Sequence, residues 1–253
     1  MEGMSTASVC VTFLGTGDAF NSGARRSSSY LVAAGDTRLV VDCGPTTPHA
    51  LKALGADPGH VHAVLQTHFH GDHVLGLPML LLHQQILGGP PGGLSILGPP
   101  ELKALTMDIY SRVYGRTAQR LEEKPEVARF VPMAPGTPHL LADGTHIEAF
   151  PVTHNPESIG YRITAHGRTL AFTGDTRWDD RLTQLADGAD LLVIDCTFLD
   201  EAIGDHLSYQ QIVEHRDQLP AKRIVLSHFG PDMASTTRKL EFERAHDGLV
   251  IEL

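Results

Sequence analysis

Three histidines and one aspartate stand within six residues of one another, and their types predict a metal site. The run is Thr67-His68-Phe69-His70-Gly71-Asp72-His73. A lone histidine on an apolar face is usually a hydrogen-bonded core residue, and this chain has 15 histidines among 253 residues. Four ligand-type side chains in one His-x-His-x-Asp-His unit are hard to explain in that way, because imidazole and carboxylate together are the usual ligands of zinc-type ions.

The place of this run in the chain indicates that it can serve two ions. The apolar residues 63–65 predict a buried strand that ends just before it. On an extended chain His68 and His70 point to the same side and can share one ion. Gly71 tolerates a tight turn, which redirects the last two ligands of the run toward a second point a few ångströms away.

Three further ligand candidates lie later in the chain. His154, Asp175 and His228 each follow an apolar run that predicts a strand. Two ions need more donors than one loop supplies, so histidine or aspartate at other strand ends is expected. Gly174 lets the backbone approach closely just before Asp175. The sequence therefore offers seven candidate ligands.

Composition and charge limit the class of protein. The chain is 42% hydrophobic and 20% charged, which is ordinary for a globular protein and argues against disorder. The net charge of −10 argues against a general nucleic-acid binder, whose surface would be basic. We expect one domain over residues 1–253 and a cytoplasmic location. Residues 1–8 do not look like a secretory signal, and the apolar residues 74–87 are too few to span a bilayer.

Hydrophobic patterning predicts alternating strands and helices. Strands are expected at residues 9–14, 29–33, 37–41, 63–65, 94–97, 146–152, 160–164, 169–172, 191–194 and 223–226. Helices are expected at residues 47–54, 74–87, 101–114 and 208–219. The polar, proline-containing residues 115–145 are left open. A weak internal repeat suggests two related halves, since Tyr30 and Tyr161 each begin a hairpin that ends in an Asp-containing turn. A layered sheet core covered outside by helices is therefore expected.

At these residues the chain resembles the metallo-β-lactamase superfamily and, within it, the ribonuclease Z-like branch. The resemblance covers nearly the full length. Its motifs are Phe13-Leu14-Gly15-Thr16-Gly17, Val41-Asp42-Cys43-Gly44, the His-x-His-x-Asp-His run followed by Leu75-Gly76-Leu77-Pro78, and the three later ligands in family order. The resemblance implies an α/β fold, the four-layer αβ/βα sandwich, with metals at one edge of the two sheets.

The resemblance also implies which ion each ligand would hold. The first ion would be bound by His68, His70 and His154. The second would be bound by Asp72, His73 and His228, and Asp175 would bridge the two. Thr67 or Asp42 would support these ligands from behind. The cofactor implied is a pair of divalent ions, zinc first, with manganese or iron as alternatives because these donors suit all three.

A second motif implies phosphodiester chemistry. In ribonuclease Z-like proteins a Glu-x-Thr-Phe/Tyr run precedes a His-Ser/Thr pair, and the histidine acts near the scissile phosphate beside the acid. Here Asp195-Cys196-Thr197-Phe198 and His206-Leu207-Ser208 stand in that order, with aspartate replacing glutamate. His206, oriented by Asp195, would protonate the leaving oxygen, and Asp72 would accept a proton from water. Alternatively, His206 lies in a surface loop and Ser208 merely caps the next helix.

Departures from the family pattern concern the substrate. Ribonuclease Z enzymes usually carry a long arm that grips tRNA between the motifs of His154 and Asp175, but only 20 residues separate these positions here. We therefore predict a phosphodiesterase for a small or nucleotide-type diester, with RNA disfavoured, and the resemblance suggests a homodimer. The alternatives are a tRNA 3′-processing endoribonuclease, a lactonase or thioesterase of the same fold, or a non-catalytic binding subunit.

Other reactive side chains are expected to lie outside the site. Cys10, Cys43 and Cys196 are odd in number and far apart, so core thiols are expected rather than disulfides. The pair Arg25-Arg26 either meets a substrate phosphate or lies in a solvated loop. The remaining histidines considered, each expected away from the site, are His83, His139, His146, His166, His215 and His246.

Overall fold

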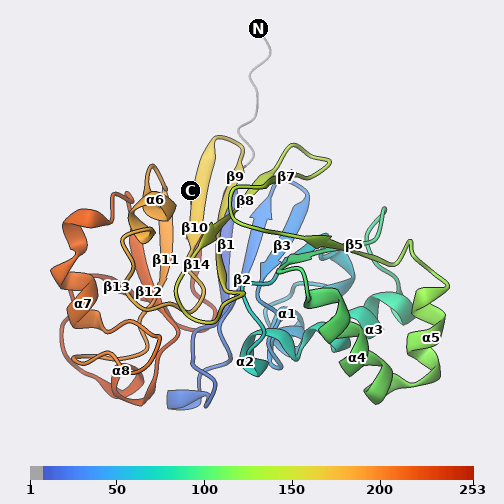
Figure 1. Ribbon diagram of the computed structural model, residues 1–253, viewed down its shortest axis with the longest axis horizontal. Helices are drawn as coiled ribbons and strands as arrows, with labels where there is room; N and C mark the ends of the chain where they lie inside the picture. Colours follow the sequence, from blue (N-terminus) through green and yellow to red (C-terminus); the bar gives the residue numbers. More distant parts are fainter. Residues whose placement is uncertain (1–7) are drawn as a thin grey trace, which may run out of the picture.

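Two packed β-sheets with helices on their outer faces make up the molecule (Figure 1). The computed structural model describes residues 8–253. The first sheet has the order β14-β1-β2-β3-β4-β5-β6, with β1 Val9–Gly15, β2 Ser29–Ala34, β3 Thr37–Val41, β4 Ala63–Leu65, β5 Leu94–Gly98, β6 Ala128–Pro132 and β14 Val250–Glu252. The second has the order β13-β12-β11-β10-β9-β8-β7, with β7 Pro138–Leu140, β8 His146–Pro151, β9 Ile159–Ala165, β10 Arg168–Phe172, β11 Leu191–Asp195, β12 Ile224–Ser227 and β13 Glu243–Arg244.

The helices lie between these strands in sequence. They are α1 Thr47–Ala53, α2 Gly71–Val74, α3 Leu77–Leu87, α4 Leu102–Tyr114, α5 Arg116–Glu122, α6 Leu182–Ala186, α7 Tyr209–Glu214 and α8 Pro231–Ser235. In Figure 1, α3, α4 and α5 lie on one side of the sheets and α6 and α7 on the other. Among the described residues, no helix is long and apolar enough to cross a membrane.

The two sheets repeat one topology. In the first, β1, β2 and β3 are antiparallel neighbours, and β3, β4, β5 and β6 are parallel. In the second, β8, β9 and β10 are antiparallel, and β10, β11, β12 and β13 are parallel. Tyr30 pairs with Val41 at the end of β3, and Tyr161 pairs with Phe172 at the end of β10. The weak sequence repeat thus corresponds to two equivalent hairpins.

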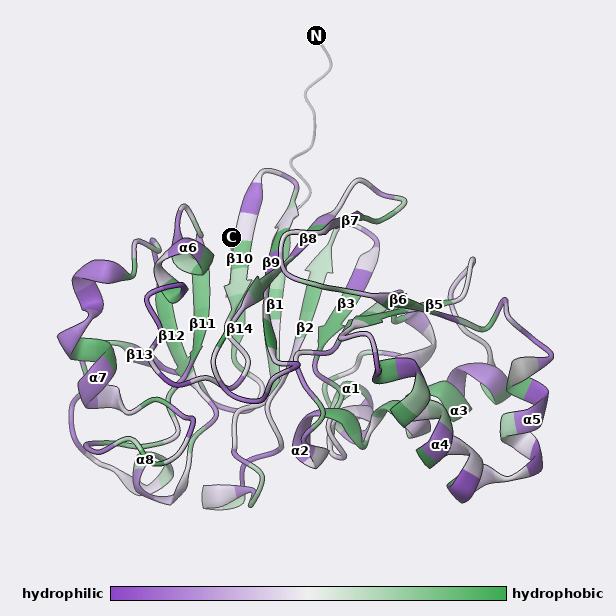
Figure 2. Cartoon of the chain, viewed as in Figure 1, coloured by the Kyte–Doolittle hydropathy of each residue, from purple (hydrophilic) through white to green (hydrophobic). Residues whose placement is uncertain are grey.

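The main hydrophobic core lies between the sheets. Val9, Val11 and Phe13 alternate along β1 and are buried in one cluster with Ile163 and Leu170 of the second sheet. Side chains two apart on a strand share a face, so this spacing directs one face of β1 inward. Figure 2 shows hydrophobic residues along the strands of both sheets.

Helices cover the outer faces. On the first sheet, Val40, Val64 and Ile96 form a second buried cluster with Leu51 of α1 and Leu80 of α3. The helices α6 and α7 contribute buried residues to the core of the second sheet. The order helix, sheet, sheet, helix is the predicted four-layer αβ/βα sandwich.

Some predicted elements differ from those observed. The helix expected at residues 74–87 begins only at Leu77, after the separate α2 ends at Val74. Between them the Gly76 backbone N–H donates to the Cys43 carbonyl at 2.9 Å and not to a carbonyl of the preceding turn. The helix expected at residues 208–219 is α-helical only to Glu214. Residues 115–145 contain α5 and the edge strands β6 and β7. The strands β13 and β14, of two and three residues, were not predicted.

A buried carboxylate at the start of β11 predicts pH-dependent stability. Asp190 accepts hydrogen bonds from Lys222 Nζ at 2.7 Å and from the Thr169 backbone N–H at 2.8 Å. Burial alone would raise the pKa of Asp190, but the Lys222 ammonium and the Thr169 N–H lower it overall. Since the folded-state pKa is depressed, the stabilisation is present above the unfolded pKa of about 3.9 and is lost as the pH falls through the folded value.

We expect Asp190→Asn to lower the free energy of unfolding by about 1–2 kcal/mol at neutral pH. Urea denaturation at several pH values measures this, and the difference from wild type should shrink below about pH 4. The matched control is Asp108→Asn, which removes an exposed pair with Arg112 on α4 and should cost less than about 0.5 kcal/mol. A difference for Asp190→Asn that is equal at pH 3 and pH 7 would contradict this assignment.

Candidate metal centre

The ends of several strands bring the predicted ligands to one edge of the sandwich. The His-x-His-x-Asp-His run follows β4, His154 follows β8, Asp175 follows β10 and His228 follows β12. The strands β10, β11 and β12 are parallel, so their carboxyl ends meet at the same edge. All seven predicted side chains lie together there, in two groups that share Asp175.

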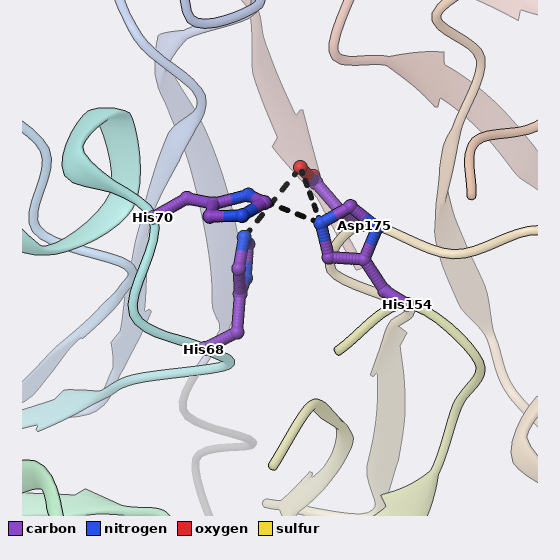
Figure 3. A group of neighbouring side chains, drawn as sticks. All are labelled: His68, His70, His154 and Asp175. Carbon is purple, nitrogen blue, oxygen red and sulfur yellow. Dashed lines mark hydrogen bonds and ion pairs between the residues drawn. The ribbon is translucent and has the colours of Figure 1, made fainter. Parts of the chain in front are cut away.

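The first group contains His68, His70, His154 and Asp175, and Figure 3 shows their side chains converging. One donor atom from each lies within 4.8 Å of the others. His154 Nε2 is 3.1 Å from His70 Nδ1 and 4.0 Å from Asp175 Oδ2, and His68 Nε2 is 3.6 Å from that same oxygen.

The second group contains Asp72, His73, Asp175 and His228. His73 Nε2 lies 3.2 Å from Asp72 Oδ2 and 3.3 Å from Asp175 Oδ1. His228 Nε2 lies 3.4 Å from Asp72 Oδ2 and 3.3 Å from Asp175 Oδ2. Asp175 therefore faces both groups, which is the position that a bridging ligand needs.

Buried nitrogens without hydrogen-bond partners test whether these groups suit a metal. Nε2 of His68 and Nε2 of His73 are buried and form no hydrogen bond, although they face the clustered donors. Ligands of a tetrahedral zinc ion are about 3.4 Å apart. The shorter donor separations, 3.1–4.0 Å, are close to that value, and all donors of a group lie within 4.8 Å of one another. The side chains therefore suit divalent metal ions.

The other ring nitrogen of four ligand histidines is held by an oxygen atom. The contacts are His68 Nδ1 to Thr67 Oγ1 (2.9 Å), His73 Nδ1 to Asp42 Oδ2 (2.8 Å), His154 Nδ1 to the Asp205 carbonyl (2.9 Å) and His228 Nδ1 to Thr197 Oγ1 (2.8 Å). Such contacts fix the orientation of each ring and leave Nε2 for the metal. Thr67 and Asp42 therefore lie where their supporting role requires.

Asp42 holds the residues around the ligands in place through several hydrogen bonds. It is buried with a positive φ of 57°, and its two carboxylate oxygens accept four hydrogen bonds. Oδ1 accepts from the Thr67 backbone N–H and the Gln66 side chain, and Oδ2 accepts from the Thr67 hydroxyl and His73 Nδ1. Every group facing Asp42 in these contacts is a donor, so only a carboxylate satisfies them all.

Charges in the site keep its carboxylates ionised but favour a proton on two of the histidines. Burial alone would raise the pKa of Asp175, but His228 and His73 hold it well below its usual range. The pKa of Asp72 is held low by the same two histidines against the effect of burial. Burial lowers the pKa of His68, which is therefore neutral near pH 7. Carboxylates and neutral imidazoles are the metal-binding forms of these residues. Burial would lower the pKa of His73 and of His228, but the Asp175 carboxylate raises both, so these two rings release a proton when a metal binds.

A third group of four side chains places His206 beside the ligands. Its members are Asp175, Asp195, His206 and His228. His206 Nδ1 lies 2.9 Å from Asp195 Oδ2, and its ring stacks on that of His228 at a centroid distance of 5.3 Å. The second Asp195 oxygen accepts from the Thr197 hydroxyl at 2.7 Å. Burial would lower the pKa of His206, but the Asp195 carboxylate raises it to about 9. His206 is therefore a protonated, oriented imidazole, and aspartate in place of glutamate reaches it.

A cavity of about 340 Å³ opens over the clustered side chains. Its floor includes ligands from both groups and His206, and its walls come from the loops after β1 and β11 and from the start of α8. The lining residues are Asp18, Ala19, Phe20, His70, Asp72, Asp175, Thr197, Phe198, His206, His228 and Pro231. No lysine or arginine is among them.

Comparison with known proteins shows the family to which this chain belongs. A family model described as "Anti-Pycsar protein Apyc1" matches residues 9–247. Ribonuclease Z of Mycobacterium bovis (strain BCG / Pasteur 1173P2) is 34% identical over 195 residues, which cover 72% of this chain and 68% of that protein. The chain belongs to the Apyc1 family of ribonuclease Z-like, metallo-β-lactamase-fold proteins. It is a metal-dependent hydrolase.

Solved structures agree with this assignment. Human tRNase Z, short form, is 26% identical with a TM-score of 0.76, and the match covers 96% of this chain and 98% of that one. The metallo-β-lactamase fold protein YhfI from Bacillus subtilis is 22% identical with a TM-score of 0.78, covering 97% and 99% of the two chains. The latter likeness shows the shared fold.

The other reactive side chains considered lie outside the two ligand groups. Arg25 and Arg26 belong to neither group: Arg25 donates to the Ala245 carbonyl at 3.2 Å, and Arg26 donates its backbone N–H to Asp247 at 2.8 Å. Both therefore tie the loop after β1 to the C-terminal segment. The other histidines considered above do not belong to the three groups found among residues 8–253. The cysteines are free thiols; Cys43 and Cys196 are buried, and Cys10 is half-buried.

Sequence reasoning did not identify two supporting contacts of this site. Asn155 Nδ2 lies 3.0 Å from His70 Nε2, and Thr197 Oγ1 joins Asp195 to His228. Thr197 stands inside the quoted Asp-Cys-Thr-Phe run, and Asn155 directly follows a ligand. In the sequence, only their closeness to a ligand or to an acid could have pointed to these two residues.

We expect Asp42→Asn to weaken metal binding by about 10- to 100-fold. An amide presents a donor on one side, so it must oppose either Thr67 or His73, and the ring of His73 loses its fixed orientation. Competition with a chromogenic chelator measures the affinity. An affinity within twofold of wild type, in a variant with unchanged circular dichroism, would remove Asp42 from the ligand-positioning network.

Proposed function

We propose that the protein is a phosphodiesterase that acts on a small or nucleotide-type phosphodiester. The observation that carries this proposal is the Asp195–His206 pair beside the metal ligands in a single cavity. A protonated imidazole is a suitable acid for a leaving alkoxide oxygen. Two clustered groups of metal ligands suit attack on a phosphorus centre.

Each residue has a distinct part in this proposal. His68, His70 and His154 would hold one ion, Asp72, His73 and His228 the other, and Asp175 both. When bound, such ions lower the pKa of water and neutralise phosphoryl oxygens. Asp72 accepts the proton of the attacking water, and His206 donates a proton to the leaving oxygen. Asp195 holds the His206 ring in place.

We propose two zinc ions as the natural cofactor, with manganese or iron as the alternatives. The support is chemical, because the donors are imidazoles and carboxylates alone, without a thiolate. Elemental analysis of protein purified without added metal would identify the ions and their number per chain.

The main alternative substrate is a tRNA precursor, since the curated relatives are named Ribonuclease Z. The hairpin of β9 and β10 argues against this substrate. It occupies the chain between His154 and Asp175, where a tRNA-binding arm would have to be inserted. No lysine or arginine lines the cavity, and the net charge is −10. RNA binding depends on contacts between basic residues and phosphates.

A panel of substrates tests the proposal. The metal-loaded protein should cleave bis(p-nitrophenyl) phosphate and at least one 3′,5′-cyclic nucleotide, and should act on neither a 3′-extended tRNA precursor nor acyl-lactones and thioesters. Trimming of the precursor with no action on cyclic nucleotides would establish the processing role instead. Activity on lactones or thioesters alone would make the protein a carbonyl-centred hydrolase.

We further propose a homodimer, which the family resemblance suggests. The helix α3 carries exposed Met79, Ile86 and Leu87 around an apolar cavity of about 480 Å³. This surface lies apart from the metal ligands and is where we expect a second copy to bind. Light scattering should give twice the chain mass for wild type and the chain mass for Ile86→Glu, whereas a monomeric wild type would exclude the dimer. A cytoplasmic location also remains part of this proposal.

A further inference from the structure

An aromatic side chain projects into solvent at the mouth of the cavity over the metal ligands. Phe20, in the loop after β1, is 86% exposed, the highest fraction of any large hydrophobic side chain in residues 8–253. It lines the same continuous cavity as His70 and Asp175. Phe198 lines this cavity from the loop after β11. Its ring lies edge-on to the His206 ring, with 6.3 Å between the ring centroids.

The backbone around Phe20 is held in place. The Asp18 carboxylate accepts hydrogen bonds from the backbone N–H of Phe20 at 3.2 Å and from the N–H and hydroxyl of Ser22, both at 2.9 Å. The Asp18 N–H in turn donates to the Phe229 carbonyl, one residue beyond the ligand His228. The position of Phe20 is therefore tied to the metal-binding edge, although its ring is exposed to water.

The cavity offers little else to recognise a substrate away from the metals. Its side chains beyond the ligands and His206 are apolar, apart from Asp18 and Thr197. No lysine or arginine lines it to bind further phosphates, which disfavours a long nucleic-acid strand. Its volume of about 340 Å³ is at the lower end of small-molecule pockets. A flat aromatic group next to a single phosphodiester fits these features.

We propose that Phe20 is a stacking platform for the base of a nucleotide whose phosphate lies over the metal ligands. This inference rests on the proposed phosphodiesterase function and assigns Phe20 the role of holding the base of a nucleotide substrate. Stacking on an aromatic ring tolerates every base, because every base has a π-face. Phe20 is thus a specificity-determining residue that favours nucleotides over diesters without a ring.

Ligand binding tests this without depending on turnover. Isothermal titration calorimetry of the metal-loaded protein compares a nucleoside 5′-monophosphate with ribose 5-phosphate, which has the same phosphate but no base. Wild type should bind the nucleotide about 10- to 100-fold more tightly. Phe20→Ala and Phe20→Leu should lose most of this preference, and Phe20→Trp should retain it. Leu140→Ala is the control, because Leu140 is 64% exposed on β7 and absent from the cavity.

Kinetics provides a second measurement. For a 3′,5′-cyclic nucleotide, Phe20→Ala should raise KM by about 10-fold or more, with the loss falling on KM rather than kcat. An equal preference for nucleotide over ribose 5-phosphate in wild type and Phe20→Ala would overturn the platform. Retention of the preference by Phe20→Leu would overturn aromatic stacking in particular.

The platform and the phosphodiesterase can fail separately. Cleavage of diesters together with an unaffected Phe20→Ala variant would reject the platform and keep the proposed function. Loss of base preference in Phe20→Ala, in a protein that cleaves no diester, would keep the nucleotide subsite and reject the phosphodiesterase.

Discussion

Replacing Asp175 with asparagine is expected to reduce phosphodiester cleavage by on the order of 10³-fold or more. The two Asp175 oxygens lie 3.3 Å from nitrogens of His73 and His228, and Oδ2 also faces His68 and His154. An amide offers one neutral oxygen, so it cannot serve both groups or balance the charge of two cations. Metal content should fall below two ions per chain.

Kinetics and elemental analysis of one preparation measure both effects. Asp108→Asn is the matched control, since it changes the same functional group at an exposed site on α4 and should keep activity and metal content. An Asp175→Asn variant that keeps two ions and at least a tenth of the activity would show that Asp175 does not bridge them.

The second large effect is expected for His206→Ala, and its size should depend on the leaving group. General-acid catalysis contributes about 10²–10⁴-fold when the leaving group needs a proton. A ribose hydroxyl, the leaving group of a cyclic nucleotide, needs that proton, whereas p-nitrophenolate leaves readily without one. His206→Ala should therefore lose about 10²–10⁴-fold in kcat on a cyclic nucleotide. It should lose much less on bis(p-nitrophenyl) phosphate.

Asp195→Asn provides the companion test. Asp195 Oδ2 fixes His206 Nδ1 at 2.9 Å and raises the pKa of His206 to about 9, so its loss should produce the same leaving-group dependence in weaker form. Metal content should stay at the wild-type value in His206→Ala. Equal losses on both substrates, or loss of metal, would assign His206 to ligand positioning instead of proton donation.

The positions of the candidate site residues were predictable because their signals are local. Four ligands lie in one run, and His154, Asp175 and His228 each follow an apolar segment that became a strand. Parallel strands end at a common edge, so topology then brings these residues together. The supporting role expected of Asp42 has no such local signal, since it depends on the pairing of β3 with β4, which brings Asp42 beside Thr67.

Other features depend on contacts between distant segments, which local patterns do not encode. The strand β14 has three residues and is formed by pairing with β1 at the opposite end of the chain. Arg25 and Arg26 looked solvated or substrate-binding, yet their partners include Ala245 and Asp247. The helix after the metal motif is interrupted before Leu77, where the Gly76 N–H donates to the distant Cys43 carbonyl. Each outcome was decided by tertiary packing.

The most direct test of a two-metal phosphodiesterase is the rate of 3′,5′-cyclic nucleotide hydrolysis as metal is added back to chelator-treated protein. We expect activity to rise to a maximum at two ions per chain and to stay low at one. Full activity with a single ion, or no diester cleavage with two ions bound, would contradict the account.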